Sequence, residues 1–152
     1  MARKQALWRW FLVVAWIGFI WFMSAHSRPP GNPIGQLTRL VQGTPLQPPV
    51  LPGTSLAFSL GKLGHLWEYC VLGLLLAWAL LPLPSHRNVA LPIGVTVAAI
   101  DETIQRFIPG REGCLRDVAI DTVGLLLGLA TFSLLTLLCK AYLDRKTKGA
   151  RT

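Results

Sequence analysis

The chain has 152 residues, of which 52% are hydrophobic and only 14% are charged. This composition excludes an ordinary soluble domain, because a chain of this size has too few polar residues to cover so many apolar ones. The formal net charge is +8, which positive flanks of membrane spans and contact with anionic lipid explain without nucleic acid as a partner. We therefore expect one membrane-embedded domain over residues 1–152.

The first predicted helix covers residues 8–25. It contains the uncharged run Trp10–Ala25, which follows Arg3, Lys4 and Arg9. This pattern is typical of a membrane anchor and also of the apolar region of a signal peptide. The many tryptophans favour an anchor, and cleavage just after the run is the alternative. Cleavage would leave the remaining topology unchanged.

Proline recurs through the next segment, residues 26–61, and excludes a long helix there. We expect this segment to be a loop on the outer side of the membrane. Ile34, Leu37 and Val41 have the spacing of one short amphipathic turn that rests on the bundle or the membrane surface. A plain surface connector is the alternative.

Three further helices are predicted at residues 63–81, 89–108 and 118–139, each near the roughly 20 residues that cross a bilayer. Short links join them, so consecutive helices should be antiparallel neighbours. Asp101 and Glu102 interrupt the helix at 89–108, which should therefore insert only beside helices that satisfy these charges. The predicted fold is an all-α, four-helix transmembrane bundle with a proline-rich extracytoplasmic loop between helices 1 and 2.

The placement of lysine and arginine predicts the orientation. Most of the 15 lysine and arginine residues fall on the side of the two chain ends when the chain crosses four times. Retained positive charge marks the cytoplasmic side, so we expect both termini in the cytoplasm. Under this topology most of the acidic residues lie at the outer end of the bundle.

The polar residues of this outer end come from three predicted helices and one link, and they are candidate ligand-binding or polar-network residues. They are Lys62, His65, Glu68, Tyr69, Asp101, Glu102, Gln105, Arg111, Asp117 and Asp121. Helix periodicity places the first four on one face and pairs Asp101 with Gln105 at i, i+4. Arg111 is placed to bind a carboxylate through its planar guanidinium.

Asp117, Asp121, Gly124 and Gly128 form one stripe along the last helix. The two glycines fit a G-x-x-x-G pattern, which lets a neighbouring backbone approach closely, so we assign them to helix packing.

Carboxylates outnumber lysine and arginine at the outer end of the bundle. A protonated carboxyl, a charged His65, a bound cation or a cationic ligand would each offset the excess.

An internal ion-pair network that only fixes helix register is one interpretation of this cluster, and a ligand or substrate site is the one we favour. The cysteines, Cys70, Cys114 and Cys139, lie on separate segments without a disulfide or zinc spacing. The sequence thus predicts no metal site and no cofactor.

The combined pattern resembles the VanZ-like family. The residues that carry the resemblance are Lys62-x-x-His65-x-x-Glu68-Tyr69, Asp101-Glu102-x-x-Gln105, Pro109-Gly110-Arg111, Asp117 and Gly124-x-x-x-Gly128, and Ser24 fits the usual end of the first helix. The resemblance implies a multi-pass protein of the bacterial inner membrane, linked to the cell envelope and to teicoplanin resistance, an antibiotic resistance, without an established reaction. The family usually has asparagine where this chain has Asp121.

Three functions follow as hypotheses. We favour a non-enzymatic protein, partnered by the lipid bilayer, that binds a lipid-linked or glycopeptide ligand at the outer polar end. A membrane-embedded hydrolase or transferase is the alternative, with His65, Glu68, Asp101 or Glu102 as acid, base or metal ligand. Ion passage is a third hypothesis, although the inner halves of the spans lack polar lining. The sequence leaves the oligomeric state open.

Overall fold

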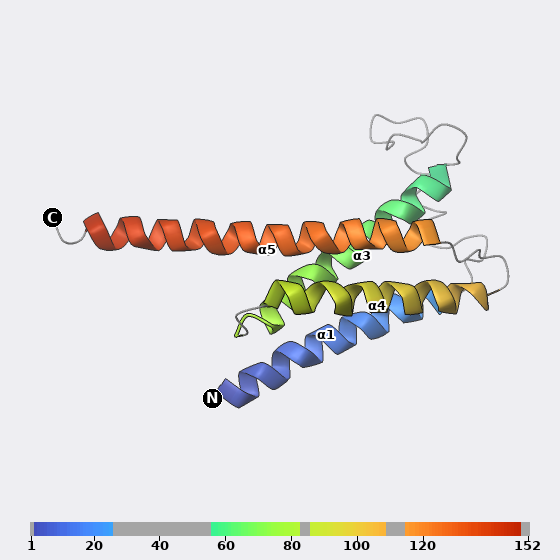
Figure 1. The fold of residues 1–152 in the computed structure, drawn as a ribbon, viewed down its shortest axis with the longest axis horizontal. Coiled ribbons are helices and arrows are strands. Elements are labelled where there is room, and N and C mark those ends of the chain that lie inside the picture. Colours follow the sequence, from blue (N-terminus) through green and yellow to red (C-terminus); the bar gives the residue numbers. More distant parts are fainter. Residues whose placement is uncertain (1, 26–55, 83–85, 109–114, 150–152) are drawn as a thin grey trace.

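The computed structural model describes residues 2–25, 56–82, 86–108 and 115–149. Within these ranges the chain forms helices and no strand, so the predicted all-helical class is confirmed. The helices are α1 (Ala2–Ala25), α3 (Leu56–Ala79), α4 (His86–Arg106) and α5 (Leu115–Gly149) (Figure 1). The amphipathic turn predicted around Ile34 and the candidate residue Arg111 lie outside the described residues.

Consecutive helices in this part of the chain reverse direction. Figure 1 shows α1 and α4 running toward the side on which α3 and α5 begin, and the start of α1 and the end of α5 both lie toward the opposite side. The interface between α3 and α5 is the most extensive, α4 packs against both, and α1 packs on α3 and α4. This up-and-down order brings the end of α4 and the starts of α3 and α5 to one side of the bundle.

The helices are longer than the predicted spans at most of their ends. α1 begins at Ala2 instead of residue 8, and α5 ends at Gly149 instead of residue 139. The predicted loop at 26–61 is corrected at its end, where residues from Leu56 onward are helical because no proline lies between Pro52 and Pro82. Hydropathy identifies only the stretch that suits hydrocarbon, whereas backbone hydrogen bonds continue through flanking polar residues.

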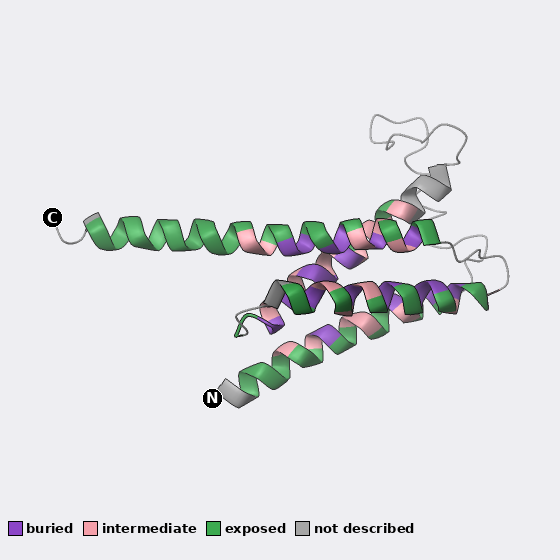
Figure 2. Ribbon diagram, viewed as in Figure 1, coloured by how far each residue is buried: buried purple, intermediate pink, exposed green. Residues whose placement is uncertain are grey.

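Two helices contain segments long and apolar enough to cross a membrane, Lys4–Ala25 in α1 and Leu115–Lys148 in α5. Both helices expose large apolar side chains, such as Phe11 and Val14 on α1 and Leu137 on α5. Figure 2 shows that α5 is exposed throughout residues 134–148. Contiguous exposed apolar surface of this kind marks contact with a membrane or a partner. With 35 residues, α5 is about 52 Å long, which exceeds the roughly 30 Å hydrocarbon core.

Glycines bring α3 and α5 together. A Cβ atom on Gly124 would overlap the carbonyl oxygen of Leu66, and one on Gly128 would overlap that of Cys70. From the other side, a Cβ on Gly73 would overlap the carbonyl oxygen of Leu125. The obstacles are backbone atoms, which cannot rotate away, so these positions require glycine for the observed approach.

α1 is held to the bundle by side chains along its length. The indole Nε1 of Trp16 donates a hydrogen bond to the Glu68 carbonyl at 2.9 Å, and Ile20 is fully buried. At the opposite end the guanidinium of Arg9 lies over the ring of Trp78, 5.1 Å from its centroid. The Trp16 and Arg9 contacts join α1 to α3 at two levels along the helices.

Candidate functional site

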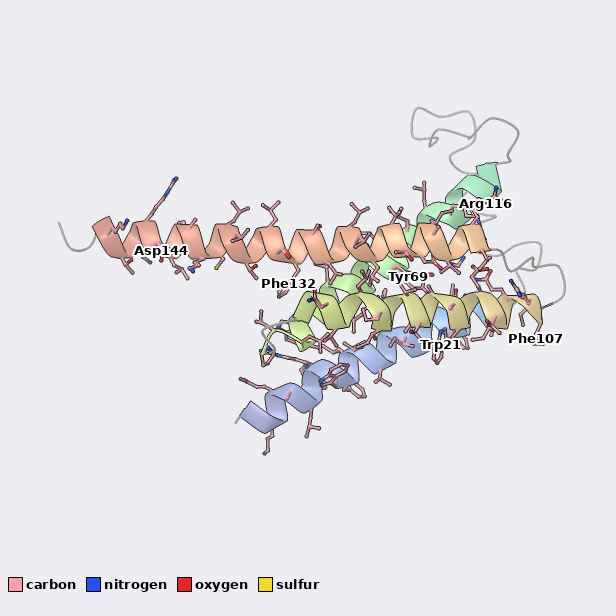
Figure 3. The ribbon with its side chains drawn as sticks, viewed as in Figure 1. Trp21, Tyr69, Phe107, Arg116, Phe132 and Asp144 are labelled. Atoms are coloured by element: carbon pink, nitrogen blue, oxygen red, sulfur yellow. The ribbon has the colours of Figure 1, made fainter. Side chains whose placement is uncertain are left out.

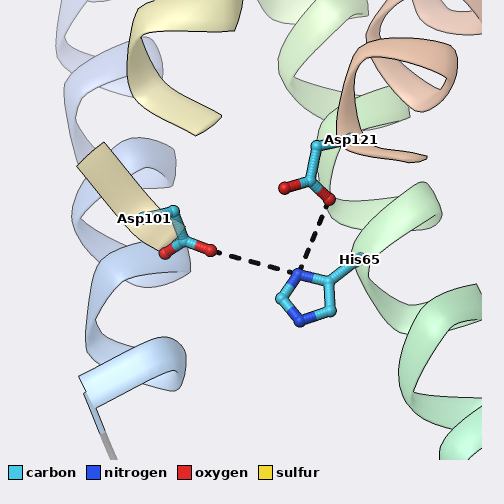
Figure 4. Close-up of side chains that lie close together, drawn as sticks. All are labelled: His65, Asp101 and Asp121. Atoms are coloured by element: carbon cyan, nitrogen blue, oxygen red, sulfur yellow. Dashed lines mark ion pairs between the residues drawn. The ribbon is translucent and has the colours of Figure 1, made fainter. Parts of the chain in front are cut away.

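His65, Asp101 and Asp121 meet inside the bundle, and each comes from a different helix. His65 lies on α3, Asp101 on α4 and Asp121 on α5. The His65 Nδ1 atom lies 4.0 Å from Asp101 Oδ2 and 3.7 Å from Asp121 Oδ1 (Figure 4). Glu68, one turn along α3, brings a third carboxylate oxygen to 3.8 Å from the same nitrogen. One imidazole nitrogen thus lies among three carboxylates, and we call His65, Glu68, Asp101 and Asp121 the acidic cluster.

Three members of the acidic cluster are shielded from solvent. Asp101 and Asp121 are fully buried and His65 is 9% exposed, whereas Glu68 is only partly buried. The helix stripe that carries Asp121 also carries Gly124, which lies one turn farther along α5 against the backbone of α3. The close approach of the two helices therefore brings the Asp121 carboxylate to the imidazole on the facing helix.

A hydrogen-bond chain ties the cluster to α1. The side-chain Nε2 of Gln105 donates a hydrogen bond to Asp101 Oδ2 at 3.0 Å, and these two residues form the predicted i, i+4 pair on α4. The same nitrogen also donates to the Oγ of Ser24 at 3.4 Å. Ser24 is 2% exposed, at the end of α1. Sequence reasoning did not place Ser24 among the site residues, because nothing in its local pattern shows which helix it faces.

Lys62 and Asp117 form an ion pair between the starts of α3 and α5. The carboxylate of Asp117 lies in the first turn of α5, where the helix dipole also favours a negative charge. This pair occupies the edge of the site, one turn of each helix away from His65 and Asp121. It neutralises one carboxylate and leaves the charge of the acidic cluster unchanged.

Tyr69 and Glu102 complete the described site residues. Tyr69 is fully buried on α3 within the bundle (Figure 3), and Glu102 on α4 is 4% exposed. The Tyr69 hydroxyl has no hydrogen-bond partner among the residues that the structure describes. Arg116, by contrast, is exposed at the start of α5. Tyr69 and Glu102 therefore add a buried phenol and a buried carboxylate next to the acidic cluster.

Asp121 has the least satisfied carboxylate. Neither of its oxygens accepts a hydrogen bond from the described part of the chain, and the 3.7 Å to His65 Nδ1 exceeds hydrogen-bond length. A buried carboxylate without hydrogen bonds is costly unless a cation or a proton compensates it. The arrangement is chemically suited to bind a cation or a positively charged group, or to move a proton through His65.

A groove of about 570 Å³ lies elsewhere, between the first half of α4 and the middle of α5. Its lining is mainly apolar and includes Leu91, Leu126 and Leu137. Such a surface suits a lipid chain better than a polar ligand. The chemistry-bearing residues and this groove are therefore separate features.

The chain was compared with known proteins. The model of the family described as VanZ/LLP1 matches residues 9–136, which is most of the 152-residue chain. The match confirms the resemblance that the residue pattern predicted, and the matched range includes all the candidate site residues. No curated protein and no solved structure matches the chain.

Proposed function

Because the chain belongs to the VanZ/LLP1 family, we propose that it is a four-span protein of the bacterial cytoplasmic membrane that binds a cell-envelope ligand at its acidic end. The ligand class is a lipid-linked cell-wall precursor or a glycopeptide, and the protein acts as a binding protein. Both termini lie in the cytoplasm, and the acidic cluster faces the extracytoplasmic side.

The antiparallel order of the helices supports the four crossings. α3 and α4 lie between the apolar helices α1 and α5 and have similar lengths to α1. The acidic side chains on α3 and α4 make these helices poor spans in isolation, but their neighbours cover the charges. The basic residues near the end of α5, Lys146 and Lys148, fit a cytoplasmic end.

The observation that carries the binding proposal is the buried Asp121 carboxylate, which accepts no hydrogen bond from the described residues and lies among further acidic groups. A ligand that brings a protonated amine or hydroxyl donors would satisfy it. Ionisable residues inside a membrane bundle are costly and commonly mark functional sites. An amphipathic ligand could present such a head group while its apolar part remains in the lipid.

Binding to purified full-length protein in lipid nanodiscs tests this function, with teicoplanin and a lipid-linked cell-wall precursor as probes. We expect at least one probe to bind, and Asp121→Asn to weaken that binding at least tenfold. Asp144→Asn is the matched control, because Asp144 is an exposed aspartate far along the same helix (Figure 3). Absence of binding by both probes, or equal binding by both variants, would contradict the proposal.

A membrane-embedded hydrolase or transferase is the second candidate, and the position of His65 favours it. An imidazole oriented by carboxylates is a suitable general base, and the 3.7–4.0 Å separations allow tightening when a substrate binds. Turnover of the lipid-linked precursor by the purified protein is the test. Activity that is equal in wild type and Glu102→Gln would exclude a catalytic role for Glu102, and no turnover would remove this candidate.

A further inference from the structure

The geometry of the acidic cluster selects one kind of ligand from those that would offset its charge. One ring nitrogen of His65 and one carboxylate oxygen each from Asp101 and Asp121 all lie within 4.8 Å of one another, and all three residues are buried (Figure 4). Each of the three comes from a different helix, so no local spacing motif marks them. We infer that His65, Asp101 and Asp121 together bind a divalent transition-metal ion, with Zn²⁺ as the leading candidate.

The distances suit this ion after a modest contraction. Zinc bonds to nitrogen and oxygen donors measure about 2.1 Å, so donors in a tetrahedral shell lie about 3.4 Å apart. The imidazole nitrogen is 3.7 Å from Asp121 Oδ1 and 4.0 Å from Asp101 Oδ2. Side-chain movements that shorten the separations between donor atoms by about 0.3 Å to at most about 1.4 Å would close the shell. Three protein ligands leave a fourth position for water or for the nearby carboxylate of Glu68.

A second observation points to a bound ion independently of the distances among the three donor atoms. Asp121 is fully buried, and neither of its oxygens accepts a hydrogen bond from the described chain, although its carboxylate points at the imidazole (Figure 4). A metal ion would supply the missing partner for this carboxylate. It would also offset the excess of negative charge that the acidic cluster concentrates in one place.

The surroundings fit the outer shell of a metal site. Ligating carboxylates in proteins are themselves hydrogen-bonded, and this fixes their orientation. Gln105 donates to Asp101 Oδ2 at 3.0 Å and links it to Ser24 on α1. One imidazole with two carboxylates is a donor set that accepts zinc, manganese or iron, and zinc binds most tightly of the three in the general affinity order.

The competing explanation is a protonated His65 that pairs with the carboxylates without any metal. The two explanations predict different metal contents for the purified protein. The experiment uses full-length, tag-free protein in nanodiscs, stripped with a chelator, loaded with Zn²⁺ or Mn²⁺ and desalted. We expect about one equivalent of zinc per chain by elemental mass spectrometry and a melting temperature that rises with Zn²⁺.

Asp121→Asn and His65→Gln should each weaken zinc binding more than tenfold and abolish the zinc-dependent rise in melting temperature. Asp144→Asn, an exposed aspartate on the same helix, should bind zinc as the wild type does. Two ligand variants are used so that misfolding of either one leaves the other informative. A wild type with less than a tenth of an equivalent of metal, or full zinc binding by the folded variants, would overturn the inference.

This inference goes beyond the proposed function, because metal binding is measured without an envelope ligand. Retained zinc binding together with no binding of teicoplanin or the precursor would contradict only the proposed function. Ligand binding by a protein that takes up no metal would contradict only the metal site.

Discussion

Substitution of Gly128 by alanine should loosen the contact between α3 and α5. A Cβ atom at this position would overlap the Cys70 carbonyl oxygen and lie 3.0 Å from the backbone nitrogen of Leu74. Both obstacles belong to the backbone of α3, so the helices must separate to admit the methyl group. Overpacking of this kind costs about 1–3 kcal/mol, whereas the better helix propensity of alanine returns about 0.5–1 kcal/mol. The expected net loss of stability is at most about 2.5 kcal/mol, with a central value of about 1 kcal/mol.

Gly18→Ala provides the matched control. Gly18 lies on α1, and a Cβ atom there would meet nothing within 4 Å in the described part of the chain. The same chemical change should therefore leave stability unchanged or raise it by up to about 1 kcal/mol. The difference between the two variants isolates the close approach of the helices from the intrinsic effect of replacing glycine.

The assay is reversible unfolding of the full-length protein in mixed micelles, followed by tryptophan fluorescence as the fraction of denaturing detergent rises. We expect the midpoint of Gly128→Ala to fall below that of the wild type and that of Gly18→Ala to stay at or above it. If Gly128→Ala were as stable as Gly18→Ala, the packing argument would be refuted.

Three further predictions concern other contacts. Lys62→Met should destabilise the protein by about 1–3 kcal/mol in the same assay, because it removes the ion-pair partner of the mostly buried Asp117 carboxylate. The double variant Lys62→Met, Asp117→Asn should regain much of the lost stability, because it also removes the buried negative charge. Trp16→Phe should cost about 1 kcal/mol through the lost hydrogen bond to the Glu68 carbonyl, whereas Trp8→Phe at an exposed position should be near neutral. Reporter fusions at the two chain ends should both report the cytoplasm, and an outside signal from either end would contradict the predicted topology.

Features that depend on one helix were predictable from the sequence. Apolar runs indicated four helices, and helix periodicity paired Asp101 with Gln105, a pair that the structure joins at 3.0 Å. The length of α5 was underestimated, because a helix continues through polar residues such as Lys140 that hydropathy assigns to the outside. Boundaries therefore differed while the class and order of the elements agreed.

Features that depend on two or more helices were not predictable in the same way. Ser24 joins the site only because the end of α1 lies against α4, and no pattern within α1 reveals that neighbour. The grouping of His65, Asp101 and Asp121 likewise depends on helix crossing and rotation. Asp121 was recognisable as the departure from the usual asparagine, but its burial against His65 emerged only from the packed bundle.

The glycine contacts and the acidic cluster are parts of one arrangement. Gly124 lies against the carbonyl group of Leu66, and Leu66 directly follows His65 in the sequence. Asp121 precedes Gly124 by about one helical turn on α5. The position of the α5 backbone at Gly124 therefore sets how far the Asp121 carboxylate lies from the imidazole. A larger residue at Gly124 would push α5 outward and lengthen the 3.7 Å separation beyond the range in which one ion can contact both groups. Close packing at the small residues is thus a condition for the geometry of the acidic cluster, and a stable fold alone does not guarantee that geometry.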